Sequence, residues 1–149
     1  MDPDAAGDPG PPAPPHPRTR PAPEATMGHD PVDHAFLDPL AAAPPARAGD
    51  HPAALRLGTF DGAAVVVMRF AAGQRLDTHR APHAITVQAL DGAIGFRVGD
   101  ESGLLEPGRL VYVRAGVPHS VRAEQPAVML LTLHTGDEAG FRHSAPHRA

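Results

Sequence analysis

The chain has 149 residues, the size of one ordinary domain, and its 13 basic and 17 acidic residues give a formal net charge of −4. This balance argues against a nucleic-acid-binding surface, which needs a clustered excess of basic residues. Because the chain has no cysteine, disulfides, thiolate metal sites and cysteine nucleophiles are excluded. All 13 basic residues are arginine, so a Schiff-base lysine and the lysine of a phosphate-binding loop are excluded as well.

Proline is concentrated at the N-terminus, where residues 1–52 hold 14 of the 19 prolines. Proline fixes φ and lacks an amide proton, so this composition predicts a disordered, extended tail. The tail lacks the basic start and apolar run of a signal peptide, and no stretch of the chain is apolar enough to span a membrane. We therefore expect a cytoplasmic protein with no membrane partner.

The first apolar periodicity appears at residues 32–43, where Phe36 and Leu40 would lie on one face of a short helix. Pro44 and Pro45 would end that helix. The predicted organisation, in chain order, is a disordered tail over 1–31, an arm with a short helix over 32–54, a barrel over 55–136, and a flexible C-terminal tail over 137–149.

A β pattern runs through residues 55–136. The β-branched run at 63–70 follows Asp61-Gly62, and the runs at 84–90 and 93–98 flank Asp91-Gly92, which is typical of a two-residue hairpin. Seven or so short strands separated by glycines, with no long helix between them, predict an all-β sandwich or barrel. The remaining predicted strands are 104–105, 110–113, the vicinity of Val121, and 127–133.

Two stretches hold the histidines with the clearest functional interest, residues 73–92 with His79 and His83, and residues 108–119 with His119. Each histidine lies at a strand end or turn beside glycine or proline, where the mouth of a barrel is expected. Neutral imidazoles from two strands suit a first-row divalent metal, with an amide or carboxylate oxygen completing the ligand set. Surface positions for the same histidines are the alternative that spacing alone leaves open.

The second stretch resembles the second conserved motif of the cupin superfamily, with Gly108, Gly116 and His119 at matching positions. The phrase at 115–119, Ala-Gly-Val-Pro-His, is itself typical of small cupins.

The first stretch resembles the first cupin motif through Gly73, His79 and Gly92. It departs from that motif at the second histidine position, which is Ala81, and at the glutamate position, which is Ile85. The two motifs together imply an all-β fold, a single cupin barrel of the double-stranded β-helix or jelly-roll type.

A cupin metal site has three histidines and one glutamate or glutamine, and the resemblance assigns His79 and His119 to two of these positions. His83, two residues beyond the usual second histidine, and Gln88, through its amide oxygen, are the candidates for the others. The predicted cofactor is one divalent ion, Fe, Mn, Ni or Zn. Gln88 lies three residues from Ile85, so on a regular strand it would face the opposite side and bond at a sheet surface or dimer contact instead.

Other polar candidates have simpler explanations. His134 is expected at a strand-end surface. Arg69, Arg97 and Arg122 lie on predicted strands, where one could bind a substrate carboxylate in the barrel, although outward-facing arginine is the commoner case. Five larger apolar residues are expected in the core, and any that line a pocket would make it suited to a small organic ligand: Met68, Phe70, Ile94, Phe96 and Tyr112.

The resemblance implies a small cupin that binds a divalent metal and acts on a small organic substrate as a dioxygenase or as an isomerase or lyase; no catalytic residue is identified. The alternative is a non-enzymatic module that senses or binds a small molecule, related to the sensory domains of transcription regulators. Without a helix-turn-helix segment the chain is not expected to bind nucleic acid. A metal-free dimerising barrel is the third possibility, and a homodimer is expected in each case.

Overall fold

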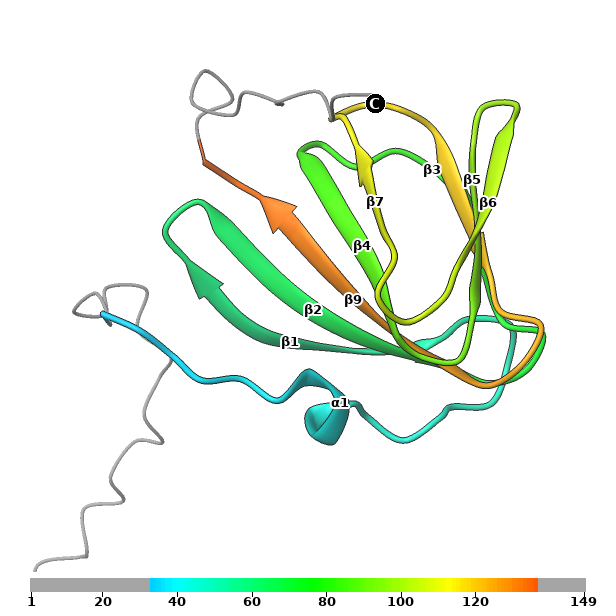
Figure 1. The fold of residues 1–149 in the computed structure, drawn as a ribbon, viewed down its shortest axis with the longest axis horizontal. Helices are drawn as coiled ribbons and strands as arrows, with labels where there is room; N and C mark the ends of the chain where they lie inside the picture. Colours follow the sequence, from blue (N-terminus) through cyan, green and yellow to red (C-terminus); the bar gives the residue numbers. More distant parts are fainter. Residues whose placement is uncertain (1–32, 137–149) are drawn as a thin grey trace, which may run out of the picture. The chain divides into compact units, whose positions relative to one another are not determined.

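The structure, a computed structural model, describes residues 33–136. Within these residues, nine strands form two antiparallel sheets that face each other (Figure 1). The first sheet has the strand order β1-β2-β9-β4-β7 and the second β3-β8-β5-β6. The strands are β1 (Ala53–Phe60), β2 (Ala63–Phe70), β3 (Arg75–His79), β4 (Ala84–Asp91), β5 (Ile94–Val98), β6 (Glu101–Leu105), β7 (Leu110–Val113), β8 (His119–Arg122) and β9 (Ala127–His134).

The all-β prediction is confirmed, and β2 and β7 have the predicted bounds. Strands β1 and β3 were not predicted. In β1 the pairing with β2 shifts register between Arg56 and Gly58, so the strand lacks the strict apolar alternation that marks a regular strand. The predicted tails over residues 1–31 and 137–149 lie outside the described residues.

The hairpin predicted at Asp91-Gly92 is wrong. Strand β4 pairs with β9 and β7, whereas β5 pairs with β6 and β8, so the turn connects one sheet to the other. Gly92 has φ +66°, and a Cβ there would lie 2.5 Å from the Pro126 carbonyl oxygen and 3.1 Å from Ala127. A sheet-to-sheet corner and a tight hairpin both need glycine with positive φ, so the same dipeptide serves either turn.

The predicted helix is shorter than the apolar pattern suggested, since α1 covers Pro39–Ala42. Asp38 caps it by accepting a hydrogen bond from the Ala41 amide at 3.1 Å. Because the residue before a proline is kept out of the helical region, Pro39 prevents the helix from starting earlier. Phe36 therefore lies outside the helix and is 96% exposed.

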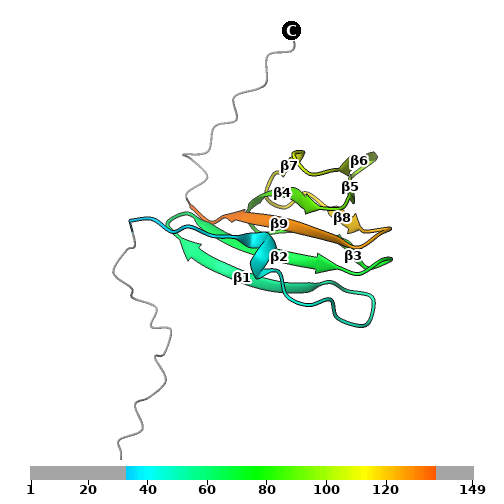
Figure 2. The ribbon, with the colours of Figure 1, turned by 60° about the horizontal axis from the view of Figure 1, so that its bottom comes forward.

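The arm that contains α1 is tied to the outer face of the first sheet, where α1 packs on β2 (Figure 2). Arg69 Nε donates to the Pro44 carbonyl oxygen at 2.8 Å. The buried Gln74 side chain donates to the Arg47 and Gly49 carbonyl oxygens and accepts from the Ala71 amide. The nitrogen and the oxygen of the Gln74 side-chain amide both have hydrogen-bond partners, so its burial leaves no polar atom unsatisfied.

The core lies between the sheets and follows strand alternation. Ile85, Val87 and Ala89 of β4 point inward, as do alternate residues of β5 and β9. Phe70 and Ile94 are fully buried there. Among the described residues no helix is long and apolar enough to cross a membrane.

The close approach at Gly92 generates a stability prediction. Gly92→Ala should lower the free energy of unfolding by about 3 kcal/mol or more, because the new methyl group meets backbone atoms that cannot move aside. Gly99→Ala is the matched control, since Gly99 has a similar φ of +58° but nothing within 4 Å of the place its methyl group would occupy. The control should cost only the strain of a left-handed residue, about 1–2 kcal/mol. Equal losses in urea unfolding would contradict the close-contact explanation.

Candidate functional site

The site is built on an irregularity in β3. Leu76 pairs with Val121 and His79 pairs with His119, so β3 spans three residues where β8 spans two. On a regular strand, residues an odd number apart face opposite sides of the sheet. The register shift reverses this parity, and both Leu76 and His79 line the cavity between the sheets.

The imidazole rings of His79 and His119 lie next to each other, and the Nδ1 atom of each ring is held by a hydrogen bond. The ring centroids of His79 and His119 are 4.4 Å apart, with an angle of 62° between the ring planes. His79 Nδ1 lies 2.7 Å from the Asp77 carbonyl oxygen, and His119 Nδ1 lies 2.9 Å from the Val117 carbonyl oxygen. Because a carbonyl oxygen can only accept, Nδ1 carries the proton in both hydrogen bonds, and in the neutral rings the Nε2 lone pairs are available.

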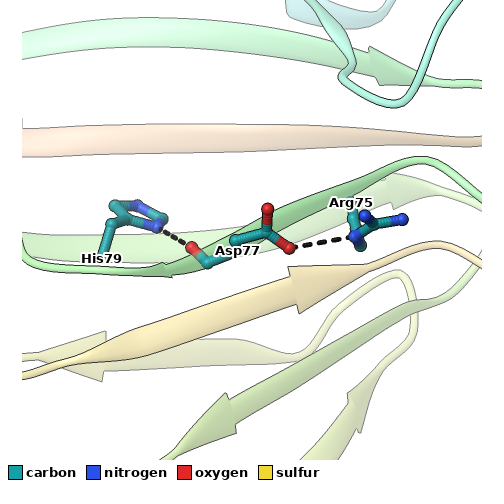
Figure 3. Close-up of polar contacts among 3 residues, drawn as sticks. All are labelled: Arg75, Asp77 and His79. Atoms are coloured by element: carbon teal, nitrogen blue, oxygen red, sulfur yellow. Dashed lines mark hydrogen bonds and ion pairs between the residues drawn. The ribbon is translucent and has the colours of Figure 1, made fainter.

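Asp77 forms hydrogen bonds with two other residues of β3, His79 and Arg75. Its main-chain oxygen accepts from His79, and its carboxylate accepts from Arg75 Nε at 2.9 Å (Figure 3). The hydrogen bond to Asp77 and its negative charge raise the pKa of Arg75. Both side chains of this pair are largely exposed, so its contribution to stability is small, but it lies directly beside the carbonyl that orients His79.

His119 is the buried member of the pair, with 3% of its surface exposed. The ring of Phe96 stacks on it, with centroids 5.6 Å apart and planes 10° apart. Burial lowers the pKa of His119; the hydrogen bond to Val117 opposes this effect, and the nearby His79 adds to it. The environment therefore favours the neutral imidazole, which is the form that binds metals.

The histidines line a cavity of about 220 Å³. Apart from His79, Arg80 and His119, its walls are apolar, and they come from both sheets. Of the apolar residues expected in the core, Met68 and Phe96 line the cavity, whereas Tyr112 is exposed, so its predicted core position is wrong. The full lining is Met68, Leu76, His79, Arg80, Ala81, Ile85, Val87, Phe96, His119, Val121, Met129, Leu131 and Leu133.

The positions where the cupin motif would hold further ligands also face this cavity, but they carry alanine and isoleucine, Ala81 and Ile85. The other two candidates are not in the lining. Gln88 lies on the far side of β4, because the pairing with β7 is regular from Ile85 to Gln88 and alternation therefore holds. His83 lies just before β4, and the cavity includes no part of it.

Within residues 33–136, no three side chains of histidine, cysteine, aspartate or glutamate are grouped closely enough to hold a metal ion. The donors that the cavity offers are thus two imidazole nitrogens. Their chemistry suits a first-row metal, and their anchored Nδ1 protons are the arrangement that orients metal-binding histidines. An ion held by two protein ligands keeps several coordination positions open and binds weakly.

The strand arginines considered from sequence do not reach the cavity; Arg69 bonds the arm, and Arg122 pairs with Glu124 at 3.1 Å. The arginine in the lining is Arg80, which sequence analysis missed. Its position directly after His79 was the available signal. His134 lies at the end of β9 with its Nε2 3.3 Å from Thr86 Oγ1, and it does not line the cavity.

The comparisons with known proteins agree with this architecture. The family model described as Cupin domain matches residues 66–133. A conserved protein of unknown function from Streptococcus pyogenes has 22% identity and a TM-score of 0.59, with 75% of this chain and 98% of that one covered. A cupin superfamily protein from Desulfitobacterium hafniense has 20% identity and a TM-score of 0.58, with 72% and 94% covered.

A third similar structure is the DMSP lyase DddQ from Ruegeria pomeroyi, at 25% identity and a TM-score of 0.54. The match covers 65% of this chain and 54% of the lyase, so it spans about half of that protein. No protein with a curated function matches the sequence.

The buried His119 predicts a pH dependence of stability. Because its pKa in the folded chain is below the ordinary value of 6.5, the unfolded chain binds more protons, and acidification favours unfolding. The stability that His119 contributes is therefore present above its ordinary pKa and is lost as pH falls below it. In metal-free protein, urea unfolding from pH 7.5 to 5 should show a smaller loss of stability for His119→Gln than for wild type. Exposed His51→Gln should follow wild type; equal pH slopes for wild type and His119→Gln would contradict the assignment.

Proposed function

Because this chain is a small cupin-domain protein, we propose that it binds a divalent metal ion through His79 and His119 and a small organic molecule in the cavity beside them. The observation that carries the proposal is the pair of anchored rings. Both Nδ1 protons are held by main-chain oxygens, which leaves both Nε2 atoms for a metal.

The metal would supply Lewis-acid or oxygen-activating chemistry at open coordination positions. The protein's own contribution is to fix the ring orientations, favour neutral His119 through burial, and surround the site with mostly apolar side chains. The expected reaction classes are those of a dioxygenase or of an isomerase or lyase. The likeness to a DMSP lyase favours the lyase class.

A second candidate is a binding module without turnover. It is favoured by the small ligand set and by the absence of any aspartate or glutamate from the described cavity lining, which leaves no carboxylate to act as a general base. In this case the cavity would bind its ligand reversibly and transmit occupancy to a partner. Ligand-induced stabilisation with no chemical change in the ligand would support this candidate over the enzyme.

Metal binding is tested by loading untagged protein with Fe(II), Mn, Ni or Zn and measuring metal content by mass spectrometry. We expect close to one ion per chain at saturation, and an affinity at least about tenfold lower in His79→Ala and in His119→Ala, since each removes one of two ligands. His83→Ala and His134→Ala are matched controls, because neither ring lines the cavity. Equal metal content in wild type and His119→Ala would place any bound ion elsewhere.

A variant with two added metal ligands tests the same site by raising its affinity. Ala81 and Ile85 face the cavity at positions where the cupin motif has histidine and glutamate, so Ala81→His combined with Ile85→Glu adds two donors. We expect zinc or nickel affinity to rise by at least about a hundredfold, because four protein ligands replace two. Gln88→Glu is the control, since it adds a carboxylate on the other side of β4. An unchanged affinity in a folded double variant would contradict the proposed site.

A further inference from the structure

Arg80 is the one permanently charged residue among the described residues that line the cavity; it is exposed, and the lining has no acidic residue. We propose that the ligand is a small organic acid, whose carboxylate binds Arg80 while its apolar body fills the cavity. The inference rests on the proposed function in taking this cavity as the ligand site.

The guanidinium is held at the junction of two loops. Arg80 Nη1 donates to the Gly116 carbonyl oxygen at 3.0 Å, and the Gly116 amide donates to the Ala81 carbonyl oxygen at 2.8 Å. These hydrogen bonds join the segment after β3 to the segment before β8, next to both histidines. An arginine has five N–H donors, so this contact leaves most of the guanidinium for a ligand.

No carboxylate in the described part of the chain neutralises this charge. The ion pairs there involve Arg75 with Asp77 and Arg122 with Glu124, and neither includes Arg80. An exposed guanidinium at the edge of an apolar cavity attracts an anion, and its planar donors match a carboxylate in bidentate geometry. A singly charged carboxylate fits better than a phosphate, because the lining offers one cation and the nearby Gly116 amide is already bonded.

The cavity also limits the body of the ligand. Its volume of about 220 Å³ is below the roughly 300–1,000 Å³ that is usual for drug-sized ligands. At about 30 Å³ for a water-sized group, it has room for about seven such groups. Since the walls away from the histidines are apolar, this space suits a short aliphatic chain or a small ring rather than a sugar or nucleotide.

The test uses hexanoate and its uncharged analogue hexanamide, titrated calorimetrically into metal-free wild type, Arg80→Gln and Arg97→Gln. Arg97 is the matched control, because it is exposed and donates to a main-chain oxygen, that of Gly99 at 3.0 Å, but lies outside the lining. We expect hexanoate to bind wild type and Arg97→Gln at least tenfold more tightly than hexanamide. Arg80→Gln should lose this preference while binding hexanamide as before, and thermal unfolding should show that it is folded.

The outcomes separate this inference from metal binding. Arg80-dependent hexanoate binding supports the inference even if no metal binds. If hexanoate binds only the metal-loaded protein, with the same affinity in Arg80→Gln, the acid is held by the ion; the inference is then overturned while the metal proposal stands. Equal binding of the two probes to wild type, or binding of neither in the metal-free and metal-loaded forms, also overturns it.

Discussion

The pairing of β3 with β8 is the constraint on which the site depends. Between Leu76 and His79 the strand carries one residue more than its partner, and this single residue turns His79 from the outer side of the sheet to the inner side. On β8, His119 is two residues from Val121, so these two side chains face the same side of the sheet without a register shift. Two histidines with different local spacing thus reach one cavity because the pairing of the strands, and not either strand alone, sets their direction.

The carbonyl oxygens of Asp77 and Val117 then determine how the rings are presented. Each accepts a hydrogen bond from a histidine two residues later, so both rings are oriented by the backbone of their own segments. The cost of burying His119 is reduced by keeping it neutral, by its hydrogen bond and by its contact with Phe96. The site is therefore organised in advance for a metal or for a polar group of a ligand.

Ala81 and Ile85 occupy the positions where the cupin motif has histidine and glutamate. The cavity therefore has fewer groups that could bind a metal and more apolar surface. Two donors that would hold an ion tightly are absent, and the space beside the histidines is bounded by methyl groups. Arg80 then becomes the charged feature of the lining, held at the mouth by Gly116. A cavity with two imidazole donors, apolar walls and one arginine would select an organic ligand more strongly than a metal ion.

Residue pattern alone determined the all-β class and the bounds of β2 and β7, because strand alternation has a period of two that can be followed along the sequence. It left Gln88 open between the two faces of its strand, and the regular pairing of β4 with β7 places it away from the cavity. The resemblance to the cupin motifs predicted His79 and His119 as metal ligands, with His83 and Gln88 as further candidates. Only the tertiary structure decided that the turn at Gly92 joins two sheets, that α1 is a single short turn, and that Arg80 lines the cavity. The physical reason is that sheet membership and register shifts depend on partners far along the chain, whereas propensity and alternation act between neighbours.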